Sequence, residues 1–216
     1  MNYIKTLIKG VLAGICISIG GWLCLKTNAV MSNNILGAFL FPIGLILICN
    51  FGYFLYTGKI CYLFENKEQT YKTKIIDLCL GLCGNMLGCL IISLLLNLAA
   101  RNLNYVVFEN VQNMVLIKVN YKWYEMIILS AFCGMLVYVA VEGFKVIENI
   151  IGKYVVLILA IAGFIICGFE HSVANMFYYF LAGDFSYKAI LSLLICVVGN
   201  SIGGLFIPVL KSTINK

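Results

Sequence analysis

Six apolar blocks follow one another along this chain, and each is wide enough to cross a lipid bilayer. A transmembrane helix needs about 17 to 25 mostly apolar residues. Because lipid offers no partners for backbone N–H and C=O groups, repeated spans of this kind predict helices. We expect an all-α polytopic membrane protein with six transmembrane helices, forming one domain over residues 1–216. The blocks lie at roughly 10–26, 35–57, 76–99, 124–141, 154–182 and 188–210.

The composition lies outside the range of soluble proteins. Of the 216 residues, 62 % are hydrophobic and 11 % are charged, whereas soluble domains are about half apolar and about a quarter charged. The net charge is +6, but the charged residues lie between the apolar blocks rather than in one patch. Such charges are typical of loops that set membrane orientation. We therefore predict a lipid bilayer and no nucleic acid among the partners.

Side chains that carry metal or acid–base chemistry are scarce. The ten cysteines have no metal-ligand spacing, and thiols in apolar segments pack as small hydrophobic groups. A single histidine cannot supply paired haem ligands, and no pair of acids within a span or serine–histidine–acid set is found. We predict no metal, no cofactor and no enzymatic activity.

The distribution of lysine and arginine predicts the orientation. With both termini inside, the inner segments carry ten of these residues and the outer segments five. An excess of positive charge marks cytoplasmic loops, so we expect cytoplasmic termini. The lysine-, asparagine- and isoleucine-rich composition suggests a low-GC bacterium, so we expect a bacterial plasma membrane. The inner set is Lys5, Lys9, Lys59, Lys67, Lys72, Lys74, Lys145, Lys153, Lys211 and Lys216, and the outer set is Lys26, Arg101, Lys118, Lys122 and Lys188.

A short motif occurs twice. GNMLGCL begins at Gly84 in the third block and GNSIGGL begins at Gly199 in the sixth, an offset of 115 residues. The same offset relates Thr57, in the polar break YTGK of the second block, to Ser172 in the fifth. The second and fifth helices are therefore predicted to be broken at corresponding places.

Three spans in each half mean that the second half enters the membrane from the opposite face. The halves, about 1–100 and 116–216, would then be inverted repeats. Inverted repeats with paired broken helices point to a transport site near the bilayer midplane. Irregular backbone at that depth is tolerated only where protein or a water-filled cavity satisfies it.

One segment combines apolar and ionisable residues. GFEHSVANMF, residues 168–177, holds the only histidine, His171, beside Glu170. Ionisable residues within a span commonly mark functional sites. The alternative is a histidine whose two nitrogens are bonded by neighbouring helices and that only holds the bundle together. Imidazole titrates near neutral pH, so a functional His171 would suit a small anion or weak acid. Glu170 is a candidate structural partner for loop amides or for a lysine.

These motifs together resemble the formate–nitrite transporter family. The likeness rests on GFEHSVANMF, on the two GN-x-x-G-x-L motifs and on LYTGK after FPIGLIL, and it extends from about Gly10 to Leu210. The resemblance implies homopentamers of six-span protomers with an aquaporin-like fold and one pore per protomer. It also implies passage of small monovalent anions or their acids: formate, nitrite, hydrosulfide, lactate or acetate.

The resemblance assigns eight residues to the substrate pathway. His171 would be the central histidine, and Thr57 the loop threonine that faces it. Four apolar side chains would form two constrictions, and Lys118 would belong to the outer mouth. Asn200 would be a pore asparagine, although Asn85 and Asn200 could instead be hydrogen-bonding links between helices. Without the family, the four apolar residues would read as core packing: Phe41, Leu45, Leu55 and Phe164.

The chain also departs from the family pattern. The family's loop commonly reads ELFTGN, and here Phe54, Tyr56 and Lys59 replace the acid, the phenylalanine and the asparagine. Gly134 stands where the fourth span commonly has an asparagine. Lys145 lies near the inner end of that span and could add positive charge at that mouth. These changes bear on the substrate and on pH gating rather than on the fold.

The expected mechanism follows from desolvation. Desolvating a bare anion so that it can cross apolar constrictions costs much free energy, whereas desolvating a neutral acid costs far less. Lys118 and Lys122 would attract the anion, which would take up a proton near His171, cross largely neutral and release the proton on the far side. A rival scheme keeps the anion charged and makes His171 the cation that stabilises it. A third alternative is an aquaporin-like pore for neutral small solutes, although the Asn-Pro-Ala boxes of such pores are missing.

Overall fold

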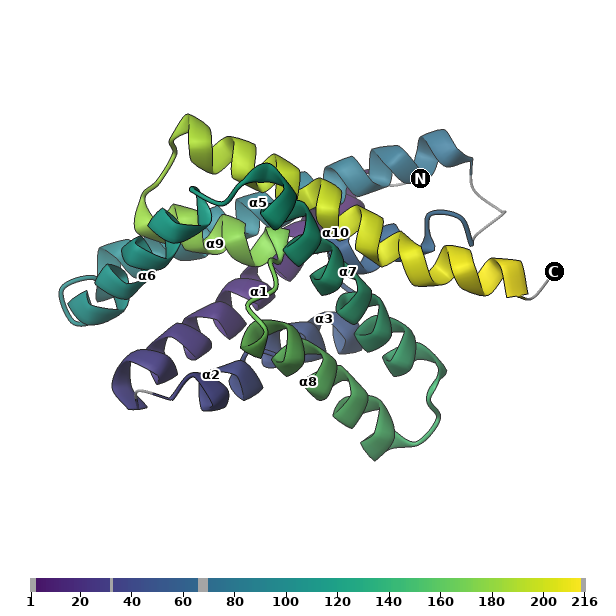
Figure 1. Ribbon diagram of the computed structural model, residues 1–216, viewed down its shortest axis with the longest axis horizontal. Coiled ribbons are helices and arrows are strands. Elements are labelled where there is room, and N and C mark those ends of the chain that lie inside the picture. The colour runs from purple at the N-terminus through teal and green to yellow at the C-terminus, as the bar shows by residue number, and fades with distance from the viewer. Residues whose placement is uncertain (1–2, 32, 66–69, 215–216) are drawn as a thin grey trace.

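The computed structural model describes residues 3–31, 33–65 and 70–214, and these residues form helices joined by short connections (Figure 1). Two residues that entered the charge distribution, Lys67 and Lys216, lie outside the described residues. The helices are α1 (Tyr3–Met31), α2 (Asn34–Leu40), α3 (Ile43–Phe51), α4 (Tyr56–Lys59), the 3₁₀ turn η1 (Ile60–Tyr62), α5 (Tyr71–Ala100), α6 (Tyr105–Lys118), α7 (Trp123–Val146), α8 (Ile150–Ile166), α9 (Ser172–Ala182) and α10 (Tyr187–Ile214).

Five segments of the described chain are long and apolar enough to cross a membrane: α1, α2 with α3, α5, α7 and α10. The apolar helix α8 is shorter, at 17 residues, because the chain breaks after it and resumes as α9. These segments coincide with the apolar blocks of the sequence, and the prediction of an all-helical, multi-pass fold is confirmed. The helix α6 was not predicted, since its residues were assigned to a loop.

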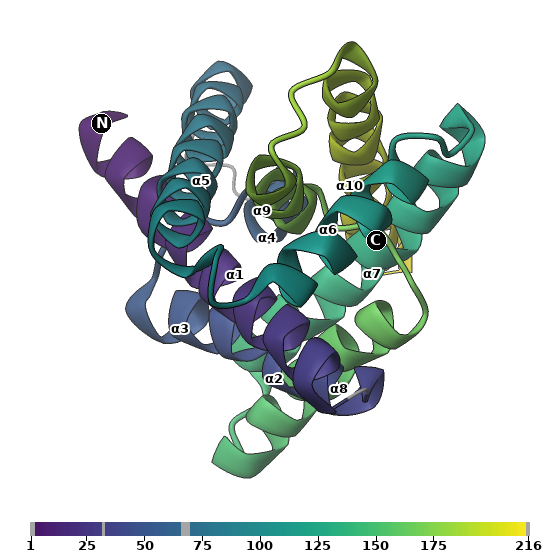
Figure 2. The ribbon, with the colours of Figure 1, turned by 90° about the vertical axis from the view of Figure 1, so that its left-hand side faces the viewer.

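Two pairs of helices cross in close contact on either side of the centre. α1 packs along α5, and α7 packs along α10. Glycine allows this approach, because a Cβ atom at Gly14 would collide with the carbonyl of Asn85, and one at Gly134 would collide with that of Asn200. Figure 2 shows α9 lying between α5 and α10, with the short α4 beside it. The centre of the bundle is thus filled by half-helices rather than by continuous ones.

Both breaks have the same construction. Gly52 follows the end of α3, and Gly168 follows α8 after one residue; these glycines have φ angles of 65° and 68°. The left-handed region is accessible to glycine at little cost, which explains the residue type at both turns. Three residues after each glycine the chain starts a new helix, with Leu55 as the N-cap of α4 and His171 as the N-cap of α9. The two predicted breaks are therefore present.

The two ends of the chain lie on one side of the molecule, and α6 lies on the other (Figure 1). On the side of the termini, the carbonyl of Lys9 accepts a hydrogen bond from the amide of Phe54, and Lys211 forms an ion pair with Glu142. We use "terminal side" and "distal side" for these two ends of the bundle.

Candidate functional site

A hydrogen bond between two broken helices marks the centre of the molecule. Oγ1 of Thr57, in the first turn of α4, lies 2.9 Å from Nε2 of His171, the N-cap of α9. Neither residue is more than 3 % exposed. The ring of His171 also stacks on that of Phe164, with centroids 5.7 Å apart and an interplanar angle of 12°. The only imidazole of the chain is therefore fixed on both its edge and its face.

The hydrogen bonds of the imidazole determine its tautomer. Nδ1 of His171 accepts the backbone N–H of Ala174, at 3.1 Å, and so caps α9. A nitrogen that accepts a hydrogen bond carries no proton, so in the neutral ring Nε2 carries it. Nε2 then donates to Thr57, whose own hydroxyl hydrogen remains available. The arrangement accommodates a neutral His171, because a second proton on Nδ1 would face the N–H of Ala174.

Two asparagines hold the backbone of the two breaks. Asn85 donates through Nδ2 to the carbonyls of Gly10 and Phe54, and its Oδ1 accepts the amide of Tyr56. The three bonds are 2.8 to 2.9 Å long. Asn85 is fully buried. Its side chain thus supplies partners that a helix break would otherwise leave unbonded in an apolar surrounding.

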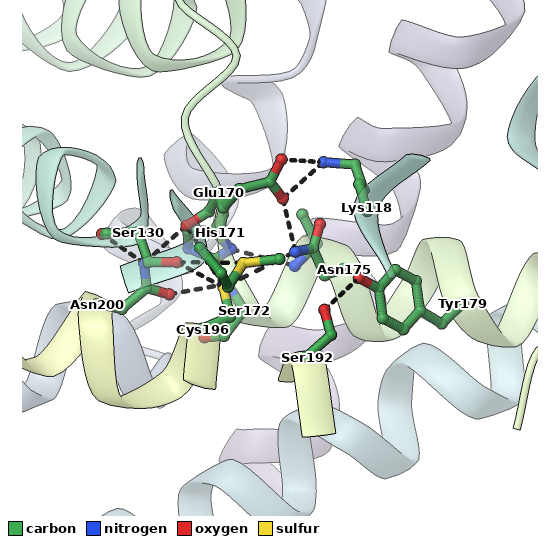
Figure 3. Close-up of polar contacts among 12 residues, drawn as sticks. Lys118, Ser130, Glu170, His171, Ser172, Asn175, Tyr179, Ser192, Cys196 and Asn200 are labelled. Atoms are coloured by element: carbon green, nitrogen blue, oxygen red, sulfur yellow. Dashed lines mark hydrogen bonds and ion pairs between the residues drawn. The ribbon is translucent and has the colours of Figure 1, made fainter. Parts of the chain in front are cut away.

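Asn200 repeats this pattern at the second break. Its Nδ2 donates to the carbonyls of Ser130 and Glu170, and its Oδ1 accepts the amide of Ser172, each at 2.8 Å (Figure 3). The two asparagines accept the amides of Tyr56 and Ser172, which are 116 residues apart, whereas the asparagines themselves are 115 residues apart. The correspondence of Thr57 with Ser172 expected from the sequence is therefore shifted by one residue at the breaks.

A buried ion pair lies beside the histidine on the distal side. Nζ of Lys118, the last residue of α6, is 2.6 Å from both carboxylate oxygens of Glu170, and Nδ2 of Asn175 donates to the same carboxylate at 2.8 Å (Figure 3). Glu170 is only 2 % exposed. Lys118 is thus not the free cation expected at the mouth, because its charge is balanced by Glu170.

Two cavities approach the centre from opposite sides. The distal cavity has a volume of about 480 Å³, and its wall includes Lys118, Glu170 and His171. It ends at Phe41 and Phe164, whose ring centroids are 5.9 Å apart in an edge-to-face arrangement. Both rings are almost fully buried. The distal cavity is therefore closed by two aromatic side chains next to the histidine.

The terminal cavity has a volume of about 530 Å³ and opens towards the side of the chain ends. Its closed end includes Leu45 and Leu55, each 2 % exposed. Its wall also contains Lys59, from α4, and Lys145, from the last turn of α7. Apolar side chains thus separate the two cavities from both directions.

The structure brings most of the predicted site residues together. His171 and Thr57 are hydrogen-bonded, and five others line one cavity or the other: Phe41, Phe164 and Lys118 on the distal side, Leu45 and Leu55 on the terminal side. Asn200 lines neither cavity, because its amide is occupied by backbone groups behind the break. Its contacts are those of the alternative, a hydrogen-bonding link between helices.

Sequence reasoning missed one member of the site. Asn175 lies four residues after His171 and was not singled out, although both groups face the same cavity. Its position in the ionisable segment was the available signal, since a buried amide within a span needs partners. Glu170 had been left open as a partner of loop amides or of a lysine, and its carboxylate bonds to a lysine, Lys118, and to the side-chain amide of Asn175 in α9.

Apolar helices that cross a bilayer several times, with two broken helices joined at a polar centre, define a multi-pass membrane protein. The chain belongs to the formate/nitrite transporter family, because the model of that family matches residues 1–213. Among curated proteins it is similar to the formate channel FocB of Escherichia coli, with 27 % identity over 152 residues, and to the formate channel FocA of Haemophilus influenzae, with 24 % identity over 184 residues.

These alignments cover 67 % and 79 % of this chain, but 52 % and 63 % of the relatives, so the match spans about half to two thirds of their length. Solved structures share the fold over nearly the whole chain. A structure described as a pentameric formate channel with formate bound has a TM-score of 0.86 and 23 % identity, covering 99 % of this chain and 97 % of that one. A structure described as an FNT family ion channel has a TM-score of 0.83 and 21 % identity, covering 99 % of this chain and 89 % of that one.

Proposed function

We propose that this protein passes small monovalent anions, or their weak acids, across a bacterial plasma membrane. Formate, nitrite and hydrosulfide are the expected substrates. Two curated relatives are formate channels, and one similar structure is described with formate bound. The observation that carries the proposal is the histidine–threonine bond at the end of a cavity that opens on the distal side.

The tautomer of His171 favours the neutral-acid scheme over the cationic one. A cationic ring would need a proton on Nδ1, which faces the N–H of Ala174. Losing that cap and burying a charge would both cost free energy. The neutral ring keeps both of its bonds, with Thr57 as the acceptor. We therefore propose that the neutral form of His171 is the one that operates.

The permeant species then crosses largely uncharged. An anion entering the distal cavity meets Phe41 and Phe164, which offer no compensation for its hydration. It takes a proton from the solvent-connected cavity, passes the apolar region as the acid, and releases the proton beyond Leu45 and Leu55. The hydroxyl hydrogen of Thr57 is available to bond the acid on its way. Net movement follows the combined gradient of anion and proton.

Assembly and topology complete the proposal. We expect a homopentamer, each protomer with its own pathway, since the similar structure is described as pentameric. We expect cytoplasmic termini, which would make the terminal side the inner side. The repeated break construction supports two inverted halves, about 1–100 and 116–216, within one transmembrane domain.

Flux into proteoliposomes tests this function. Purified protein would be offered formate, nitrite, hydrosulfide, acetate, lactate and glycerol in a stopped-flow instrument, at about pH 5.5 and about pH 7.5, on either side of the range in which imidazole and many weak acids change charge. We expect fast flux of one or more of the anions, faster at the lower pH. Flux of glycerol alone would indicate a pore for neutral solutes, and flux no faster than in empty liposomes would contradict the proposal.

A further inference from the structure

The terminal cavity carries positive charge that the proposed pathway does not use. Lys59 and Lys145 reach its wall from different elements, α4 and the end of α7. Lys59 also lines a neighbouring cavity, together with Lys9. Both Lys59 and Lys145 are exposed. Two cations from separate parts of the chain therefore line one cavity.

Neither ammonium group is neutralised by a carboxylate in the part of the chain that the structure describes. Nζ of Lys145 lies over the ring of Tyr62, 4.7 Å from its centroid, and Nζ of Lys59 lies over Phe54 at 5.9 Å. The nearby acid Glu142 is already bonded to the hydroxyl of Tyr62 and to Lys211. An aromatic face leaves the other side of an ammonium group free to bind an anion.

The charges of this cavity add up to one positive charge. Its described wall contains two lysines and one acid, Glu65. A single monovalent anion would therefore neutralise it. The closed end is apolar, formed by the buried side chains of Leu45 and Leu55. Positive charge at the mouth and apolar side chains at the end match a ligand with a charged head and an apolar body.

We propose that the terminal cavity is a binding site for monocarboxylates with a longer carbon chain than acetate or lactate, such as hexanoate, with the carboxylate between Lys59 and Lys145 and the carbon chain towards Leu45 and Leu55. Such a ligand fits a space of about 530 Å³, but its body is too large to follow formate between buried side chains. It occupies the cavity and blocks it from the terminal side. The proposed binding depends only on the geometry of the cavity, whereas the proposed inhibition of transport depends also on the proposed function.

Calorimetry with hexanoate tests the binding in detergent-solubilised full-length protein, at neutral pH and with empty micelles subtracted. Acetate has the same head without the body, and hexanamide has the body without the charge. We expect hexanoate to bind most tightly, with acetate and hexanamide each at least about five-fold weaker. An affinity for hexanamide equal to that for hexanoate would overturn the role of the lysines, and equal affinity for acetate would overturn the role of the apolar end.

Charge-removing variants locate the site. Lys59→Gln and Lys145→Gln should each weaken hexanoate binding about three-fold, as expected for an exposed ion pair, and the double variant about ten-fold. Lys72→Gln removes the same charge from an exposed lysine at the start of α5 and outside this wall, and it should leave binding unchanged. Size-exclusion profiles and thermal midpoints check that the variants fold. Equal affinity in the double variant and the wild type would refute the site.

Flux separates this inference from the proposed function. Hexanoate should slow formate entry into proteoliposomes of the wild type more than in the Lys59→Gln/Lys145→Gln variant. If the wild type passes no formate at all, the proposed function fails, while the calorimetric result still decides whether the site exists. If formate passes and hexanoate binds at the two lysines without slowing it, the blocking role is overturned.

Discussion

Asn85 and Asn200 make the same three hydrogen bonds, each to two carbonyls and one amide of the backbone, although 115 residues separate them. One holds the break before α4 and the other the break before α9. The two asparagines belong to the repeated GN motif, so the repetition in the sequence corresponds to a repeated way of satisfying interrupted backbone.

Replacing either asparagine by leucine should destabilise the protein to a similar extent. Each substitution removes the amide that holds the break, at the carbonyl of Phe54 and the N–H of Tyr56 for Asn85, or at the carbonyl of Glu170 and the N–H of Ser172 for Asn200, at a cost of about 2 kcal/mol or more. Thermal midpoints in detergent would measure the loss. Asn113→Leu, at an exposed site in α6, should stay within about 0.5 kcal/mol of the wild type. A much larger effect at one asparagine than at the other would contradict their equivalence.

The tautomer of His171 can be observed directly. Because the chain has one histidine, a sample labelled with ¹⁵N-histidine gives signals from this ring alone. We expect a neutral ring at neutral pH with the proton on Nε2, since Nδ1 accepts the amide of Ala174. A proton on Nδ1, in either the neutral or the charged ring, would be incompatible with the hydrogen bonds described for this site.

Thr57→Val should destabilise the protein more than Thr57→Ser does. Valine has a similar shape but leaves the Nε2–H of His171 without its acceptor, which costs about 1 to 3 kcal/mol. Serine keeps the hydroxyl. Thermal midpoints would give the stability difference, and formate flux would show whether the hydroxyl is needed for passage. Equal stability and equal flux in the two variants would remove the bond from the account of the site.

The ion pair of Lys118 and Glu170 should behave as a coupled unit. Lys118→Met leaves a carboxylate that is 2 % exposed without its cation, and should cost about 3 kcal/mol. Adding Glu170→Gln to that variant should recover much of the loss, because no unpaired charge remains and Asn175 can bond to the amide oxygen. The double-mutant cycle measures the coupling. Additive losses would mean that the two residues act independently.

Glycine at the crossing of α7 and α10 should not tolerate a methyl group. At Gly203 a Cβ atom would collide with the carbonyl of Ala131, a backbone atom that cannot rotate away. Gly163→Ala is the matched control, because a Cβ there meets no atom within 4 Å and alanine favours a helix by about 1 kcal/mol. We expect a lower thermal midpoint for Gly203→Ala and an unchanged or higher one for Gly163→Ala.

The sequence predicted the helices and the breaks because both leave local signals. Apolar length marks the spans, and the polar residues at Thr57 and His171 mark the interruptions. The salt bridge of Lys118 and Glu170 leaves no such signal, since its partners are 52 residues apart and meet only through the placement of α6. That helix escaped prediction because its apolar residues are interrupted by polar ones, as in a loop. The backbone bonds of Asn200 likewise depend on tertiary contacts.

The construction of the two breaks has a consequence for the control of flux. Moving the central loops would require breaking the four hydrogen bonds by which the two asparagines hold the loop backbone, two at each asparagine. We therefore expect the centre to stay rigid during transport, while the two ends of the pathway can change. Regulation by pH, by ligands or by neighbouring subunits is therefore expected to act at the mouths of the cavities, where side chains can move without the backbone.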